Sequence, residues 1–205
     1  MLSMKRRTRN KEKTRETILS IAFEEIYRRG FQAVSVQEIV DKAGLTKGAF
    51  FHHFSTKQAL GYALVDETLK RLVLDRWIRP LEDYENPVEG IVDNLKKIID
   101  ATPQERLALG CPLNNLIQEM SPVDPTFAAK LQGVLQFWID GVEKYLAKAK
   151  VRGHLPRGAD VRRLAEFIVM NHEGAFGISK SLKSRKVFLS LQASLRDYVR
   201  SVANH

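Results

Sequence analysis

The sequence is poor in several features that would place it in other classes of protein. Its single cysteine, Cys111, excludes an intramolecular disulfide and indicates a reducing compartment. The longest stretch without a charged residue is twelve residues, 107–118, which is too short to span a bilayer. The basic start, MLSMKRRTRNKEK, is not followed by an apolar segment, so we expect no secretory signal. These absences predict a soluble, cytoplasmic protein.

Motifs for catalysis and metal binding are also missing. The chain contains no phosphate-cradling glycine-rich loop, no G-x-S-x-G, no H-E-x-x-H and no C-x-x-C. The pair His172 and Glu173 has no nucleophile beside it. Because His52 and His53 are adjacent, they point about 100° apart on a helix and cannot share a metal as residues four apart do. We therefore expect no enzyme, no metal site and no cofactor.

Positive charge is concentrated at the start of the chain. The formal net charge is +9 over 205 residues. Residues 1–57 carry 12 Lys and Arg against 6 Asp and Glu, a net of +6, and residues 58–205 carry 21 against 18, a net of +3. This distribution indicates a polyanionic partner, either nucleic acid or an anionic membrane. The outermost cations either bind DNA or form a solvated tail; the set is Lys5, Arg6, Arg7, Arg9, Lys11, Lys13 and Arg15.

The hydrophobic pattern is helical nearly throughout, and no stretch alternates at period two for long enough to form a strand. Apolar residues make up 44% of the chain, enough for a substantial core. Three capping residues, Asn86, Thr102 and Asp124, each precede a proline, which predicts three helix starts. The sequence predicts an all-α protein with helices over about 13–29, 35–43, 46–54, 57–79, 86–101, 102–110, 112–120, 124–150, 160–181 and 184–203.

Residues 35–54 have the local signals of a helix–turn–helix unit. Ser35 with Glu38 forms a capping box, and Gly44 can adopt the left-handed conformation that ends a helix. Thr46 then caps a second short helix. In such a unit the second helix can enter the major groove of DNA.

The second helix of this unit suits that task. It begins with Lys47-Gly48-Ala49, which are small or flexible enough to approach base edges, and Phe50 and Phe54 share a face that locks the helix to the core. His52 and His53 can donate hydrogen bonds to phosphate. Lys57 opens the next helix, where a phosphate can meet both the ammonium and the free N–H groups of the helix start.

These residues resemble a known family. The stretch 14–64, and above all GFQAVSVQEIVDKAGLTKGAFFHHFSTKQAL, is similar to the DNA-binding domain of the TetR family of transcriptional regulators. The shared features are the glycine–aromatic pair, the capped helix, the Ala-Gly turn, the Lys-Gly start and the F-x-x-K exit. The resemblance implies a repressor that binds a palindromic DNA operator as a homodimer and is released by a small-molecule inducer. The alternative is a non-specific architectural DNA-binding protein.

The resemblance also implies roles for single residues. One position departs from the family pattern: the family usually has a tyrosine whose hydroxyl reaches a phosphate, where this chain has Phe51. Phe51 can only contact a sugar or a thymine methyl group, or pack. The implied base contacts are Gln37, Lys47, Gly48 and Ala49, and the implied DNA-backbone contacts are Thr46, Phe51, His52, His53 and Lys57.

We expect three parts: a basic arm (1–12), a DNA-binding domain (13–57), and a helical ligand-binding and dimerisation domain (58–205). In the last helix apolar residues recur alternately three and four residues apart, which predicts a helical neighbour. That neighbour is either a second copy of the chain or the chain's own domain. The expected interface residues are Leu164, Ile168, Ala175, Ile178, Phe188, Leu191, Leu195, Tyr198 and Val202.

Polar groups on otherwise apolar helices are the best indicators of a ligand pocket, because a buried polar group needs a partner. Cys111 precedes Pro112 near a helix start, where the helix dipole lowers a thiol pKa, so Cys111 is either a sensor or a packing residue. Aromatic residues such as Phe127, Trp138 and Phe176 are either core or pocket. The expected pocket residues are Cys111, Asn114, Asn115, Gln118, Phe137, Phe167, Met170, Asn171 and Glu173.

Overall fold

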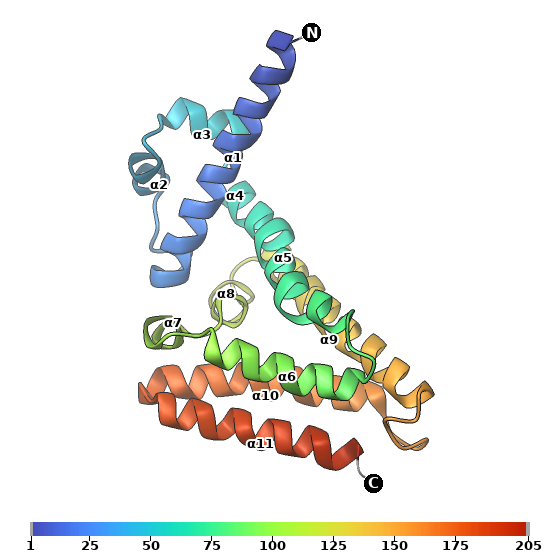
Figure 1. Ribbon diagram of the computed structural model, residues 1–205. Helices are drawn as coiled ribbons and strands as arrows, with labels where there is room; N and C mark the ends of the chain where they lie inside the picture. Colours follow the sequence, from blue (N-terminus) through green and yellow to red (C-terminus); the bar gives the residue numbers. More distant parts are fainter. Residues whose placement is uncertain (1, 204–205) are drawn as a thin grey trace. The chain divides into compact units, whose positions relative to one another are not determined.

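The computed structural model describes residues 2–203, with side chains from residue 11 onward. The predicted all-α class is confirmed, since no described residue forms a strand (Figure 1). No helix in this part of the chain is long and apolar enough to cross a membrane. The α-helices are α1 (Leu2–Arg29), α2 (Val36–Ala43), α3 (Lys47–His53), α4 (Lys57–Ala63), α5 (Lys70–Val73), α6 (Pro87–Asp100), α7 (Gln104–Leu109), α8 (Pro112–Met120), α9 (Pro125–Val151), α10 (Val161–Leu182) and α11 (Arg185–Ala203).

Two of the three predicted proline-associated caps are confirmed. Asn86 accepts a hydrogen bond from the backbone of Val88 (3.0 Å) at the start of α6. Asp124 accepts from the backbone of Thr126 (2.8 Å) at the start of α9. The cap predicted at Thr102 is wrong, because its hydroxyl donates to the carbonyl of Ile98 (2.6 Å) at the end of α6. The Thr102 side chain is thus bonded to the last turn of α6 and does not cap α7.

Two further differences between the predicted and observed helices concern their length and their type. Helix α1 begins at Leu2, well before the predicted start near residue 13. The helix predicted over 57–79 is broken into α4, a π-helical segment η1 (Leu64–Leu69), α5, a second π segment η2 (Leu74–Ile78) and a 3-10 turn η3 (Arg79–Leu81). A π segment displaces the usual helical hydrogen bonds, and here the buried Asn94 side chain donates to the carbonyl of Arg76 (2.7 Å).

The chain forms two compact units. The first comprises Met1–Leu69 and Asn115–Leu131, so it includes the end of α8 and the start of α9 together with the helix–turn–helix. In it, Phe31 packs edge-on against Phe127 with ring centroids 4.8 Å apart. Tyr62 donates to Asp124 (2.8 Å). Phe127 is therefore core in this unit, not pocket.

The second unit comprises Lys70–Asn114 and Gln132–His205. Helices α6, α10 and α11 lie side by side within it (Figure 1), and α7 packs against α10. Its core contains a ring cluster in which Trp77 lies 4.8 Å from Trp138 and 4.6 Å from His172, measured between centroids. Phe176 continues the cluster, 5.0 Å from His172. These aromatic side chains are buried.

The close packing around α4 can be tested at Gly61. A methyl group there would lie 2.4 Å from Phe127 and 2.6 Å from Phe31, so Gly61→Ala should lower the free energy of unfolding by about 1–3 kcal/mol. Gly133 of α9 is the matched control, because a methyl group there meets nothing within 4 Å. Gly133→Ala should raise stability by about 0.5–1 kcal/mol. Urea denaturation measures both, and equal midpoints for the two variants would contradict the packing described.

Candidate nucleic-acid interface and ligand site

The turn between α2 and α3 is built as the sequence predicts. Gly44 is left-handed (φ 63°), and Leu45 donates its backbone N–H to the carbonyl of Val40 (2.9 Å). Thr46 then caps α3 by accepting from the backbone of Ala49 (3.1 Å). Because φ near +60° is costly for residues with a side chain, a glycine fixes the angle between the two helices.

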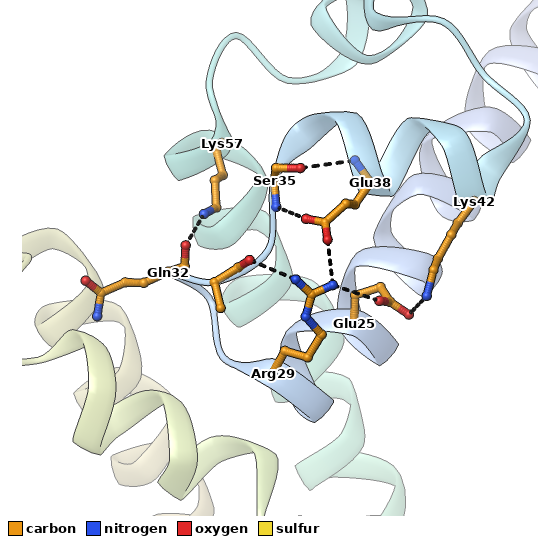
Figure 2. A network of polar contacts seen from close by, with 8 residues as sticks. Glu25, Arg29, Gln32, Ser35, Glu38, Lys42 and Lys57 are labelled. Carbon is orange, nitrogen blue, oxygen red and sulfur yellow. Dashed lines mark hydrogen bonds and ion pairs between the residues drawn. The ribbon is translucent and has the colours of Figure 1, made fainter.

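An ion-pair network holds α2 against α1 (Figure 2). The Glu38 carboxylate accepts from the backbone of Ser35 (2.8 Å) and pairs with Arg29 (2.6 Å). Glu25 pairs with Lys42 (2.6 Å) at the far end of α2. The Ser35 N–H, followed by Arg29, lowers the pKa of Glu38 to about 2, so the carboxylate stays ionised at any physiological pH.

The start of α3 is presented to solvent while its other face is buried. Lys47 and Gly48 are exposed and Ala49 is half-buried. Phe50 and Phe54 are buried, as predicted, and fix the helix to the core. Phe51 is 51% exposed, and its ring lies edge-on to that of Phe50 with centroids 5.3 Å apart, so part of a large apolar ring faces outward. This arrangement leaves the helix start free to approach another molecule.

Gln37, on α2, is also exposed and donates its side-chain amide to Asp41 one turn later (2.6 Å). An amide has two N–H donors and an acceptor oxygen, so the bond to Asp41 orients the group and leaves an N–H and the oxygen for a partner. That pair of groups is what reading an adenine requires.

The residues expected at the DNA backbone differ in exposure. Thr46 and His52 are exposed, whereas His53 and Lys57 are half-buried. Burial lowers the pKa of His53, and electrostatic repulsion from His52, Lys11 and Arg15 lowers it further. At neutral pH His53 is therefore a neutral hydrogen-bond donor and not a cation.

The basic arm is described only in part. Lys11 and Lys13 are exposed on α1. Arg15 is bound to Glu67 and lies over the ring of Phe54 (5.1 Å), so it is held within its own unit. The side chains of four expected DNA contacts lie outside the described part: Lys5, Arg6, Arg7 and Arg9. No three His, Cys, Asp or Glu side chains among the described residues are grouped to hold a metal.

Two family models match the chain. One, described as bacterial regulatory proteins of the tetR family, matches residues 18–64, which include the helix–turn–helix. The other, described as the tetracyclin repressor-like C-terminal domain, matches residues 87–195, more than half of the 205 residues. The chain belongs to the TetR family of transcriptional regulators. That family binds DNA operators as dimers.

Individual relatives agree with this assignment. The transcriptional regulator AcuR of Cereibacter sphaeroides is 28% identical over 162 residues, covering 78% of this chain and 73% of AcuR. The transcriptional repressor DhaR of Mycobacterium sp. (strain GP1) is 24% identical over 165 residues, covering 77% and 78%. An uncharacterised HTH-type regulator of Lactococcus lactis subsp. lactis is 28% identical over 123 residues, covering 60% of this chain and 63% of its own length.

Solved structures share the fold. The regulatory protein TetR of Rhodobacter sphaeroides has a TM-score of 0.76 at 24% identity, covering 89% of this chain and 97% of that chain. The reduced form of E. coli NemR has a TM-score of 0.81 at 20% identity, covering 90% and 96%. At these identities the likeness concerns the arrangement of helices alone.

The nine residues expected to line a ligand pocket in this TetR-family chain are divided between the two compact units. Asn115 and Gln118 belong to the first unit, and the other seven belong to the second. Met170 is 62% exposed, and the exposed Asn171 donates to the carbonyl of Phe167 (2.8 Å). Phe137 lies beneath the ammonium of Lys70 (5.1 Å).

Cys111 and Glu173 do meet in the second unit. Cys111 is half-buried and packs against the core beside α8. Burial, and then the charge of Glu173, raises the pKa of its thiol well above the usual value. The expected lowering by the helix dipole is thus wrong, because desolvation outweighs it. A protonated thiol favours the packing alternative over the sensor.

Several buried polar atoms in this unit have no hydrogen-bond partner among the described residues. They include both carboxylate oxygens of Glu173, the indole N–H of Trp138 and the side-chain oxygen of Gln192. The Gln192 amide nitrogen lies 3.1 Å from His172 Nδ1. Burial lowers the pKa of His172 to about 3, so the ring is neutral. The sequence indicated Glu173, but nothing in the pattern distinguished Gln192 or Trp77.

The nine expected interface residues fall into two groups. Ile178, Leu191 and Tyr198 are 49%, 37% and 45% exposed, and Val202 is half-buried. The other five pack inside the unit, as the alternative foresaw: Leu164, Ile168, Ala175, Phe188 and Leu195 are all buried.

The buried carboxyl of Glu173 should make stability depend on pH. Burial raises its pKa to about 7 from an ordinary 4.5, so the folded state keeps a proton that the unfolded state releases. The free energy of unfolding therefore loses a contribution as pH rises from 4.5 to 7. Glu173→Gln does not titrate, so its free energy of unfolding should rise relative to that of the wild type by about 1–3 kcal/mol between pH 4.5 and 7. Chemical denaturation at several pH values measures it.

Glu105→Gln, at an exposed position, is the control and should follow the wild type at every pH. A Glu173→Gln difference that does not change between pH 4.5 and 7 would mean that the carboxyl is solvated in solution.

Proposed function

We propose that this TetR-family chain is a cytoplasmic repressor that binds a palindromic operator as a homodimer and is released by a small molecule. The observation that carries the proposal is the N-terminus of α3. There Lys47 and Gly48 are exposed, and Thr46 caps the helix. A helix presented in this way suits insertion of its N-terminal residues into the major groove. The relative DhaR is a transcriptional repressor, which supports repression as the direction of control.

In this proposal the residues divide by what they contact. Gln37, Lys47, Gly48 and Ala49 read bases, and Phe51 contacts a sugar or a thymine methyl group with its exposed ring. Thr46, His52, His53 and Lys57 contact the DNA backbone, and Lys11 and Lys13 on α1 add affinity that does not depend on sequence.

The exposed apolar side chains of α10 and α11 support the dimer. Ile178 of α10 and Leu191 and Tyr198 of α11 face solvent, and Tyr198 lies 4.4 Å from the ring of Phe167, so the two helices share this face. A methyl group at Gly174 or Gly177 would meet nothing within 4 Å, which leaves α10 smooth enough for another helix to approach. An apolar face of two adjacent helices suits a four-helix interface across a two-fold axis.

The unpartnered polar atoms of the second unit support a ligand. Native cores leave few buried polar atoms unpaired, and those that remain usually meet a water or a ligand. Here an acceptor on Gln192 and a donor on Trp138 flank the His172 ring, and Glu173 adds a carboxyl group. We infer that the inducer binds beside α10 and supplies hydrogen-bonding partners to these groups.

Selection from a random duplex library tests the proposal. The wild type should enrich one palindrome over bulk DNA, whereas an architectural protein would bind all sequences alike. Lys47→Ala should then relax the preference at one position of each half-site, at a cost of about 1–3 kcal/mol in discrimination, because a base contact is lost.

Lys13→Ala is the matched control, since it removes an equally exposed lysine placed on α1. It should weaken binding to all sequences about equally and reduce the salt slope by about one unit. If Lys47→Ala leaves the relative affinities across the library unchanged, Lys47 does not contact bases.

The dimer is tested by placing a charge on the α10–α11 face. Leu191→Glu should give folded monomers with much weaker operator binding, because burying an unpaired carboxylate in an apolar interface is costly. Light scattering measures the mass, and circular dichroism checks the fold. Val151→Glu, at an 88% exposed residue of α9, should remain dimeric. A dimeric Leu191→Glu variant would place the interface elsewhere; Leu195 is 4% exposed, so a charge there would instead unfold the subunit.

A further inference from the structure

The turn that follows α1 is held by a carboxylate from a distant part of the sequence. The backbone N–H groups of Phe31 and Gln32 donate to the two oxygens of Glu119, each at 2.8 Å. Glu119 lies on the part of α8 that belongs to the same compact unit as the helix–turn–helix. Two successive N–H groups on one carboxylate form a charge-assisted, two-pronged contact.

The turn packs closely around the Glu119 carboxylate. Gly30 is left-handed (φ 89°), and a methyl group added there would lie 3.0 Å from both Glu119 oxygens. The side chain of Phe31 is fixed as well, because it packs against Phe127 and lies close to Gly61. The backbone of residues 30–32 is therefore determined both by the Glu119 contact and by packing.

The same turn holds Lys57, an expected phosphate contact. The Lys57 ammonium donates to the carbonyl of Gln32 (3.2 Å, Figure 2) and lies over the ring of Phe31 (4.7 Å). An ammonium has three donors, so the bond to Gln32 leaves donors for a phosphate. Burial lowers the pKa of Lys57, and the charge of Glu119, followed by that of Glu38, opposes this shift. Glu119 thus fixes the groups that orient Lys57 and also favours its charged form.

We propose that Glu119 is a positioning residue for DNA binding, which clasps the turn at Phe31 and Gln32 and thereby holds the Lys57 ammonium where it meets a phosphate. The inference rests on the proposed function, in which Lys57 contacts the DNA backbone. Glu119 itself does not touch DNA in this arrangement; it acts through the carbonyl of Gln32 and the ring of Phe31. If the turn were mobile, the Lys57 side chain would lose conformational entropy when it binds DNA, and this loss would weaken the contact with phosphate.

A double-mutant cycle tests the proposal. Glu119→Ala, Lys57→Ala and the double variant are titrated, over a range of salt concentrations, with a duplex that the wild type has selected from a random library. All variants are compared at a temperature where circular dichroism shows them folded. Each single variant should weaken binding by a similar factor and reduce the salt slope by about one unit, and the double variant should bind no more weakly than Lys57→Ala.

Two further variants separate positioning from charge and from stability. Glu24→Ala removes a carboxylate of α1 that lies 3.9 Å from Arg28, and it should keep the salt slope of the wild type. Glu119→Gln keeps one good acceptor and should fall between the wild type and Glu119→Ala.

The outcomes distinguish this inference from the proposed function. Wild-type protein that selects no sequence overturns the proposed function and the inference with it. Wild-type protein that selects an operator, while Glu119→Ala lowers only the melting temperature and leaves affinity and salt slope unchanged, overturns the inference alone. Additive losses in the double variant would also overturn it, because Glu119 would then act by a route that does not include Lys57.

Discussion

The Glu38 carboxylate determines how the helix–turn–helix unit is assembled. It closes the capping box at Ser35 and pairs with Arg29 of α1, so one charge both starts α2 and docks it. A carboxylate shared between a backbone N–H and a guanidinium has a strongly lowered pKa and does not titrate near neutrality. Because α3 follows after only residues 44–46, its direction is set by that of α2. The surface offered to DNA is therefore organised before DNA arrives.

The sequence predicted this region well because its signals are local. A capping box, a left-handed glycine and a threonine cap act within one helical turn, and all three are present. The cap at Thr102 was wrong because its hydroxyl donates to the carbonyl of Ile98 in the preceding helix. The π segments between α4 and η3 were not predicted. The second of them, η2, offers the carbonyl of Arg76 to the side chain of Asn94, a contact between residues 18 apart that no local pattern shows.

Periodicity could not assign the faces of α10 and α11. An apolar stripe shows that a helix face is buried, but not whether the covering surface belongs to the same chain or to another copy. Leu195 and Leu191 lie one turn apart in the predicted seam, yet one is buried in the core and the other faces solvent. Similarly, the thiol of Cys111 was placed correctly at a helix start, but its desolvation depends on neighbours distant in sequence. Glu119 gave no signal, because a carboxylate that binds the backbone has no fixed spacing from it.

The inclusion of Asn115–Leu131 in the first unit limits how freely this protein can be divided. Tyr62 is hydrogen-bonded to Asp124, and Asp66 to Lys130. Phe31 is hydrogen-bonded through its backbone to Glu119 and packs against the ring of Phe127. A chimaeric regulator joined near residue 69 would separate each of these pairs and combine a transplanted reading helix with residues 115–131 of another protein. Exchanging residues 115–131 together with the N-terminal segment preserves the pairs. The transferable module is thus two segments of chain, and changes that adapt one segment constrain the other.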